Sequence, residues 1–179
     1  IIFEQNQRRN LQIEKILEIA KIVREKIKLK KELINLNEIM KSIINSINLS
    51  LIELNAEVIL NLSNDDILIK CDKIHLSNVL YNIVDNALKY SEPNPKITIE
   101  TLCEKNHAII KVSDNGVGIP KEFISKVSNK FFRVPTGKIH NVKGFGLGLF
   151  YVNEICKAHN WTWKINSTEN SGTEITFKI

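Results

Sequence analysis

HLSNVLYNIVDNALKYS, residues 75–91, is the stretch from which the organisation of the chain follows. Its apolar residues recur in steps of three and four, which is the spacing of one face of an amphipathic helix. Asn82, Asn86 and Lys89 fall within about 60° on the opposite face, with Tyr90 at the edge of that arc. A solvated face usually carries Glu, Lys and Arg, which form helices better than Asn. Either the chain is simply rich in asparagine, since 21 of its 179 residues are Asn, or this face binds a ligand.

The composition is that of a globular protein, with 43% hydrophobic and 25% charged residues in a chain of 179. This length allows one domain with its own core, plus an extension. No apolar run approaches the ~18 residues of a membrane span. Cys71, Cys103 and Cys156 lack metal-ligand spacing and are expected to be reduced core residues, which is typical of a cytosolic protein. The basic run KIKLKK at 26–31 has no interleaved aromatic residues, and it predicts a solvated helix face rather than a nucleic-acid site.

Hydrophobic periodicity places the expected helices and strands along the chain. Residues 13–27 have the seam of a helical bundle, and Asn35 and Asn37 can cap a second helix that reaches about residue 54. Strands are expected at 57–62, 67–71, 96–102, 108–112, 161–165 and 174–179, and further helices at 75–91 (capped by Asp72), 120–127 and 149–159. Neighbouring strands are expected to pair locally. This order predicts an α+β two-layer sandwich, in which helices cover one face of a mixed sheet of about five to six strands, with an N-terminal helical extension.

Six of the seven glycines gather at 114–118 (DNGVG), at 144–148 (GFGLG) and at 172. Asp114 ends an expected strand, and its carboxylate needs donors, of which the exocyclic amine of adenine is one. The second cluster follows residues 129–144, a loop without periodicity that is expected to be a mobile lid, and it opens a helix whose N-terminal amides favour phosphate. Amide oxygens suit hydrated Mg²⁺, and a lysine ammonium suits phosphate. Each cluster alone is explained by an ordinary turn, but the whole set in this order favours a nucleotide site.

Five motifs occur in order along the chain: NIVDNALKYS at 82–91, DNGVGIP at 114–120, KFFR at 130–133, GFGLGL at 144–149 and SGTEITF at 171–177. Together they resemble the N box, first glycine box, F box and last two glycine boxes of the catalytic ATP-binding domain of bacterial two-component sensor histidine kinases. That family belongs to a superfamily shared with DNA gyrase, Hsp90 and MutL. The resemblance covers residues 35–179 and implies a Bergerat-type ATP-binding fold with ATP and Mg²⁺ as cofactors.

At the phosphate end of the implied site, Asn86 would bind Mg²⁺, and Asn82 would support it. Lys89 would meet phosphate, and Arg133 would reach the γ-phosphate from the lid. The resemblance thus implies that Asn82 and Arg133 act in catalysis.

At the base end, Asp114 would accept the exocyclic amine of adenine, and Thr173 would support Asp114 from below. The resemblance also implies a preference for adenine over guanine, which presents a carbonyl where adenine has its amine. Further ATP contacts are implied along the motifs, at Tyr90, Gly116, Gly118, Ile119, Phe132, Gly144, Phe145, Gly146, Leu147, Gly148 and Leu149.

Residues 1–34 resemble the second helix of the family's dimerisation and phosphoacceptor hairpin, so 1–34 and 35–179 are expected to be separate domains. The phosphoacceptor His is normally followed by an acidic residue, and none of the four His in this chain is. The acceptor is therefore expected on a helix that this chain lacks. The implied partners are the dimerisation helices of the parent protein and the receiver domain of a response regulator, without nucleic acid or direct membrane contact. The implied location is the cytoplasmic side of a parent anchored in the bacterial inner membrane.

An ATP-hydrolysing conformational switch of the gyrase, chaperone or mismatch-repair type is the alternative function. Such proteins need a general base for water, and in them a Glu stands one helical turn before the Mg²⁺-binding Asn. The corresponding residue here is Asn82, whose amide cannot accept a proton at neutral pH. The sequence therefore favours phosphoryl transfer over hydrolysis.

Overall fold

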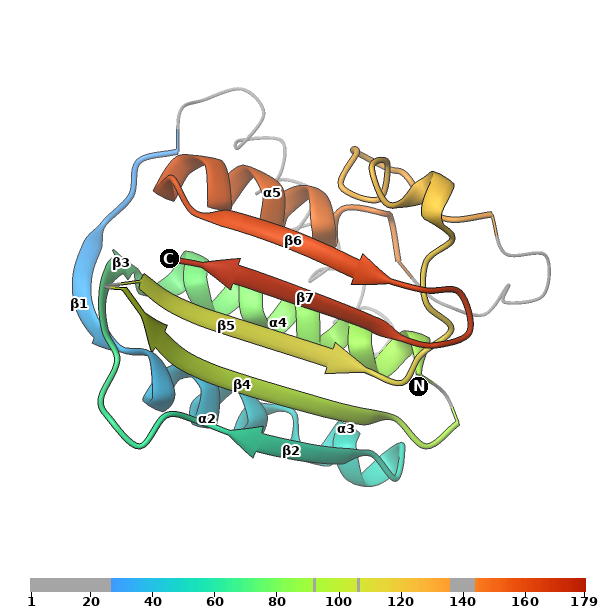
Figure 1. Ribbon diagram of the computed structural model, residues 1–179, viewed down its shortest axis with the longest axis horizontal. Coiled ribbons are helices and arrows are strands. Elements are labelled where there is room, and N and C mark those ends of the chain that lie inside the picture. The colour runs from blue at the N-terminus through green and yellow to red at the C-terminus, as the bar shows by residue number, and fades with distance from the viewer. Residues whose placement is uncertain (1–26, 92, 106, 136–143) are drawn as a thin grey trace, which may run out of the picture.

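The computed structural model describes residues 27–91, 93–105, 107–135 and 144–179 (Figure 1). Along the chain it contains β1 (Lys31–Asn35), α2 (Leu36–Ser46), α3 (Asn48–Glu53), β2 (Glu57–Asn61), β3 (Leu68–Asp72), α4 (Lys73–Tyr90), β4 (Lys96–Glu104), β5 (His107–Asp114), the 3₁₀ helix η1 (Lys121–Phe123), α5 (Gly148–His159), β6 (Thr162–Ser167) and β7 (Thr173–Lys178).

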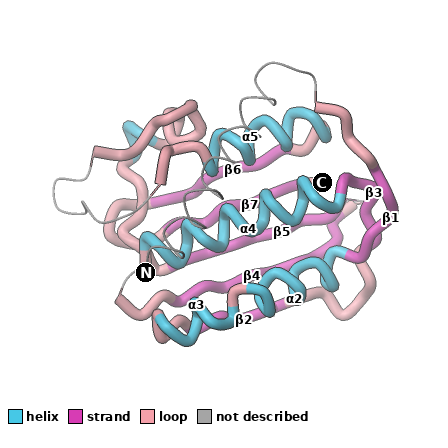
Figure 2. The backbone as a smooth tube through the Cα atoms, turned by 180° about the vertical axis from the view of Figure 1, so that it is seen from behind, coloured by secondary structure: helices cyan, strands magenta, loops and turns pink. Residues whose placement is uncertain are grey.

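Five strands form the main sheet, in the order β2-β4-β5-β7-β6 (Figure 1). β2 runs parallel to β4, and the other three pairs are antiparallel. Figure 2 shows α2, α4 and α5 side by side over one face of this sheet, with α4 in the middle. The predicted α+β two-layer sandwich with a mixed sheet is therefore confirmed.

Two hairpins make up most of the main sheet. β4 and β5 form one, β6 and β7 form the other, and the pairing of β5 with β7 joins them. Alternate residues of these strands, such as Ile110 and Phe177, face the helices and fill the core. The register of β5 and β7 places Asp114 opposite Thr173. The two hairpins therefore bring these predicted site residues to the same end of the sheet, where β5 ends and β7 begins.

α4 is the helix predicted over residues 75–91. Its whole apolar face is buried, which includes Leu76, Val79, Leu80, Ile83, Val84, Ala87 and Leu88. Asp72 caps the helix as predicted, because its Oδ1 accepts the amides of Ile74 and His75 at 3.1 Å each. The amide of Lys30 donates to the other oxygen, Oδ2, at 2.8 Å, which ties the segment before β1 to the start of α4.

β1 and β3 form a separate two-stranded antiparallel sheet, in which Ile34 lies opposite Ile69. The prediction that residues 31–34 continue the helical extension is therefore wrong. In KIKLKK at 26–31, lysines alternate with apolar residues, which is the spacing of a strand rather than of one helix face. The pairing of β1 with β3 depends in addition on residues that are distant in sequence. Residues 1–26 lie outside the described residues, so their assignment to a dimerisation hairpin stays a prediction.

Three predictions of local structure are wrong. β2 and β3 do not form the expected hairpin, since β2 pairs with β4 and β3 with β1. A parallel pair such as β2 and β4 needs a crossover, which α4 supplies, and local sequence does not reveal it. The helix expected to reach residue 54 is divided at Ile47 into α2 and α3. The helix expected over 120–127 is only η1 followed by turns.

The thiols of Cys71 and Cys156 are buried and free, as predicted, and burial raises the pKa of each to about 12. Cys103 is exposed, so its assignment to the core is wrong. Within the described ranges, no helix combines the length and the apolar character needed to cross a lipid bilayer.

Candidate nucleotide-binding site

Asp114 is the last residue of β5, and its carboxylate oxygen Oδ1 accepts two backbone amides. The donors are Gly116 at 2.8 Å and Thr173, at the start of β7, at 3.1 Å. Burial raises the pKa of the Asp114 carboxyl, while these two amides and the Ser91 hydroxyl oppose the rise. Because both amides use Oδ1, the second oxygen remains an acceptor for a ligand amine.

The end of α4 packs against the loop that follows Asp114. The amide of Val117 donates to the Tyr90 carbonyl at 3.0 Å. A Cβ on Gly116 would lie 2.5 Å from that carbonyl oxygen, so only glycine fits at this position. The structure thus brings Tyr90, Asp114 and Gly116 together, and the bare α-carbon of Gly116 is required by the protein's own backbone.

Gly118 and Ile119 contact the turn between β6 and β7. Gly118 has a φ of +66°, and a Cβ there would lie 2.0 Å from the Thr168 carbonyl oxygen. The Ile119 amide donates to Ser167 Oγ at 2.8 Å, and the same hydroxyl hydrogen-bonds Thr173 Oγ1 at 2.9 Å. Both residues therefore have a packing role in the protein, and their contact with a nucleotide stays a prediction.

The polar face of α4 meets the start of α5 at Asn82. Asn82 Nδ2 donates to the Asn78 carbonyl at 2.8 Å, and a Cβ on Gly148 would lie 3.2 Å from Asn82 Oδ1. No described side chain caps the N-terminus of α5, so the amides of its first turn are available to an anion. Asn86 is half-buried one turn further along α4, and no described residue hydrogen-bonds to its side chain. The side-chain amides on the polar face of α4 and the N-terminus of α5 therefore lie on one surface.

Lys89 forms an ion pair with Asp85, one turn earlier on α4. This partner was not predicted from the sequence, although an acid four residues before a lysine is a recognised stabilising pair in helices. Both side chains are partly exposed, at 40% for the lysine and 28% for the aspartate. An ion pair this open contributes about 0–1 kcal/mol, so it leaves Lys89 able to bind phosphate. That role stays a prediction.

The segment after η1 is anchored on the second glycine cluster. The Phe131 amide donates to the Gly146 carbonyl at 3.0 Å, and Arg133 Nη1 donates to the Gly144 carbonyl at 3.2 Å. Gly146 has a φ of +67°, and a Cβ there would lie 2.5 Å from the Phe132 carbonyl oxygen. The Phe132 ring packs on η1, where its centroid lies 5.9 Å from that of the Phe123 ring. Arg133 and the glycine cluster are therefore neighbours, as a phosphate site requires.

Three hydrophobic residues that the resemblance assigned to the nucleotide differ in their surroundings. Leu147 lies in the core with 7% exposure, Leu149 packs against the core, and Phe145 is 51% exposed. Leu147 can therefore contact a nucleotide only through its backbone. Residues 136–143, within the loop predicted to be a lid, lie outside the described residues.

Two of the His side chains have partners inside the domain. His75 Nδ1 hydrogen-bonds the Tyr151 hydroxyl at 2.8 Å. His159 is 6% exposed; its Nε2 accepts the Asp72 amide at 3.1 Å, and its Nδ1 donates to the Ile155 carbonyl at 3.1 Å. This pattern needs a neutral ring, and burial lowers the pKa of His159 accordingly. His75 and His159 therefore have packing and hydrogen-bonding roles inside the domain.

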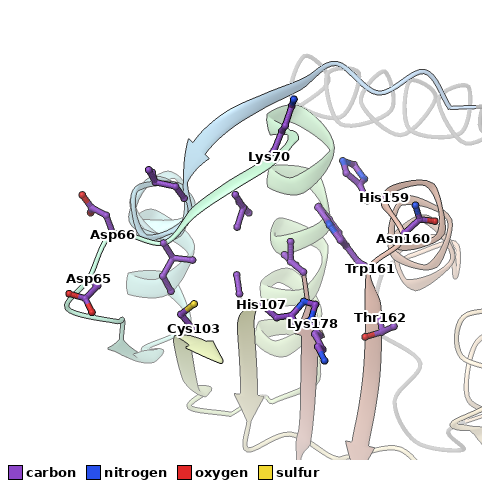
Figure 3. Close-up of a pocket in the computed structure, with 15 residues that line it drawn as sticks. Asp65, Asp66, Lys70, Cys103, His107, His159, Asn160, Trp161, Thr162 and Lys178 are labelled. Atoms are coloured by element: carbon purple, nitrogen blue, oxygen red, sulfur yellow. The ribbon is translucent and has the colours of Figure 1, made fainter. Parts of the chain in front are cut away.

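A cavity of about 960 Å³ lies at the opposite end of β5 from Asp114 (Figure 3). It opens between β3, the start of β6 and the end of β7, and its lining includes His107, His159 and Trp161. It has none of the residues that the resemblance assigns to the nucleotide. The candidate site is therefore the surface around Asp114, at the end of β5 where the motif residues lie close together, rather than this cavity.

Comparison with known proteins gives one family match and several relatives. The family model described as "Histidine kinase-, DNA gyrase B-, and HSP90-like ATPase" matches residues 71–179. The sensor protein RprX of Bacteroides fragilis (strain YCH46) is 38% identical over 181 residues, which cover 100% of this chain and 35% of RprX. The sensor histidine kinase WalK of Bacillus subtilis (strain 168) is 33% identical over 166 residues, which cover 92% of this chain and 27% of WalK. The chain thus spans between about a quarter and about a third of the length of these relatives.

Solved structures have the same fold. The catalytic domain of histidine kinase ThkA matches with a TM-score of 0.74 and 26% identity, covering 84% of this chain and 95% of that one. A structure of ThkA in complex with the response regulator protein TrrA matches with a TM-score of 0.78 and 24% identity, covering 100% of this chain and 49% of that one. The sandwich described above is therefore the fold of histidine kinase catalytic domains.

Proposed function

Because this chain belongs to the family of histidine kinase-, DNA gyrase B- and HSP90-like ATPases, we propose that it is the catalytic ATP-binding module of a two-component sensor histidine kinase. Its task would be to position Mg-ATP so that the γ-phosphoryl group passes to a His on the dimerisation and phosphoacceptor helices of its parent protein. The observation that carries the proposal is the half-buried Asp114 carboxylate, held by two amides beside Gly116 and the end of α4.

The residues at the phosphate end of the site fit a Mg²⁺ ion that binds as a complex with the nucleotide phosphates. Asn86 offers one amide oxygen, and no group of three His, Cys, Asp or Glu side chains able to hold a metal gathers in the part of the chain that the structure describes. A Mg²⁺ ion here would take most of its ligands from phosphate oxygens and water, as it commonly does. When bound, it would neutralise charge on the phosphates. Arg133 and the N-terminus of α5 would add to that stabilisation.

Asn82 disfavours the hydrolysing switch. Its side chain donates to Asn78 and lies against Gly148, and an amide has no site that removes a proton from water. What the site supplies is alignment and charge stabilisation, which suit transfer to an acceptor brought from elsewhere.

The proposal includes two protein partners. The first is the pair of dimerisation and phosphoacceptor helices of the parent protein. The second is the receiver domain of a response regulator, which the ThkA–TrrA complex supports by analogy. Since the relatives are named as sensor proteins, we place this module on the cytoplasmic side of a membrane-anchored parent, without direct contact with membrane or nucleic acid.

Asp114→Asn should weaken ATP binding and leave GTP binding unchanged or stronger. Asparagine keeps Oδ1 for the two amides, but its NH₂ group replaces the oxygen that would accept the adenine amine. Loss of a hydrogen bond to a charged group costs about 1.5–3 kcal/mol, or roughly 10–150-fold in affinity. Titration calorimetry with ATP and GTP measures both affinities.

Asp65→Asn, in the loop between β2 and β3, is the matched control and should bind ATP as the wild type does. Equal affinities of the wild type for ATP and GTP, or an unchanged ATP affinity in Asp114→Asn, would contradict the adenine assignment.

Asn86→Ala should weaken ATP binding by about tenfold in the presence of Mg²⁺, which is the scale of disturbing a metal site. In EDTA the variant and the wild type should bind ATP alike, because no ion then needs the amide oxygen. Calorimetry under both conditions makes the comparison. Asn45→Ala, at an exposed position of α2, is the control. A loss that is equal with and without Mg²⁺ would show that Asn86 is not a metal ligand.

A further inference from the structure

Ser91, the residue that ends α4, carries a buried hydroxyl without a hydrogen-bond partner. Within the described residues it is the one buried side-chain oxygen or nitrogen in this condition. A buried polar group without a partner destabilises the folded state, and such groups are rare in native proteins. The Ser91 hydroxyl therefore has a hydrogen-bonding capacity that the free domain leaves unused.

The Ser91 hydroxyl faces the carboxylate of Asp114 across Gly116. A Cβ on Gly116 would lie 2.9 Å from Ser91 Oγ and 2.8 Å from Asp114 Oδ1, so both oxygens border the same point. The hydroxyl is close enough to favour the ionised carboxylate, and it helps to hold the pKa of Asp114 down against burial. In the free domain it forms no hydrogen bond with a described residue. A rotation about the Cα–Cβ bond of Ser91 moves this oxygen without any change in the backbone.

Ser91 also connects the two ends of the candidate site. It follows directly on α4, which carries Asn82 and Asn86 on its polar face. The Tyr90 carbonyl accepts the amide of Val117, which fastens the end of this helix to the loop after Asp114. The Ser91 hydroxyl, which lies where α4 meets the loop after Asp114, is therefore well placed to orient the Asp114 carboxylate toward a ligand.

We propose that Ser91 is a positioning residue for the nucleobase: its hydroxyl donates to the Asp114 carboxylate when that carboxylate accepts the exocyclic amine of adenine. The proposal rests on the proposed function, since it needs an adenine nucleotide at Asp114. The amides of Gly116 and Thr173 hold Oδ1, and neither of them donates to Oδ2. Ser91 fixes the orientation of the remaining acceptor, and its hydroxyl gains the partner that it lacks.

Ser91→Ala tests the proposal, because it removes the hydroxyl and little else. ATP affinity, measured by titration calorimetry, should fall about three- to tenfold, the scale of one hydrogen bond. The melting temperature of the nucleotide-free domain should be unchanged or higher, since the substitution removes an unsatisfied buried group. A merely structural role would lower stability and affinity together.

Two further measurements separate an effect through Asp114 from general damage. The loss caused by Ser91→Ala should vanish in the Asp114→Asn background, because the two groups act as a unit. It should also vanish for a purine ribonucleoside triphosphate without the 6-amino group. Ser113→Ala is the matched control, because its side chain lies on the opposite face of β5 from the strand's core-facing residues, and it should bind ATP as the wild type does.

The proposal is overturned if Ser91→Ala binds ATP as tightly as the wild type, if it weakens the amine-free analogue as much as ATP, or if it lowers the melting temperature. Failure of the wild-type protein to bind ATP is a different outcome. It would remove the proposed function itself, and the role of Ser91 with it, whatever the variant does.

Discussion

Incubated alone with γ-labelled ATP, this chain will carry no acid-labile phosphate, and addition of its parent's dimerisation and phosphoacceptor helices will start the transfer. The site as proposed supplies position and charge, but neither a nucleophile nor a general base. The expected change is from background to readily measured labelling, which is larger than the change that any single substitution in the site should produce.

The surroundings of the chain's own His residues explain the expected absence of label. His75 and His159 are engaged in hydrogen bonds inside the domain. His107 opens β5, at the opposite end of that strand from Asp114. His140 lies outside the described residues and is followed by Asn rather than by an acid. An acceptor therefore has to be brought to the phosphate end of α4 by other helices.

The same helices with their phosphoacceptor His replaced by Gln are the matched control and should stay unlabelled. Acid-labile label on this chain alone would contradict the prediction and identify one of its own His residues as an acceptor. Rapid release of inorganic phosphate would favour the ATP-hydrolysing switch, with a general base other than Asn82.

Gly172→Ala should destabilise the domain by about 3 kcal/mol or more, which is among the larger effects of single substitutions. Gly172 has a φ of +89°, and a Cβ there would lie 2.0 Å from the Asp114 carbonyl oxygen. An L side chain is strained at this φ, and the obstructing atom belongs to the backbone, so it cannot simply rotate away. The melting temperature should fall by about 6–12 °C for a chain of this size. Circular dichroism measures it.

Gly144→Ala is the matched control, because a Cβ there meets nothing within 4 Å and the residue has no positive φ. Its stability should stay within about 0.5 kcal/mol of the wild type. If Gly172→Ala melts together with this control, the close approach to Asp114 does not constrain the fold.

The helix at the centre of the domain could be predicted from local pattern alone. The apolar steps in residues 75–91 specify which side of α4 is buried, and the structure buries every residue of that set. The polar side follows from the same helical geometry, so the spacing of Asn82 and Asn86 is enough to place both on one surface. The Asp72 cap obeys equally local rules.

Contacts between distant segments could not be predicted in this way. Alternation in EVILNL indicates a strand, but it does not indicate that Glu57 lies opposite Lys96 in a parallel pair. Paired glycines indicate close approach, but not that Gly116 approaches Tyr90 while Gly118 approaches Thr168. Ser91 has no local signal at all, because its interest depends on burial beside a carboxylate from another strand.

Among the strands that pair in the main sheet, β5 and β7 lie furthest apart in sequence, and the Thr173 amide donates to Asp114 across 59 residues. Single hairpins form within about 1–10 μs, whereas contacts between remote segments must first overcome the entropy of loop closure. During folding, the β4–β5 and β6–β7 hairpins are therefore expected to form before they meet, and the acceptor for adenine is incomplete until they do. A nucleotide that binds there stabilises only the fully joined chain. The fraction of chains that bind nucleotide thus reports how many have formed the β5–β7 pairing.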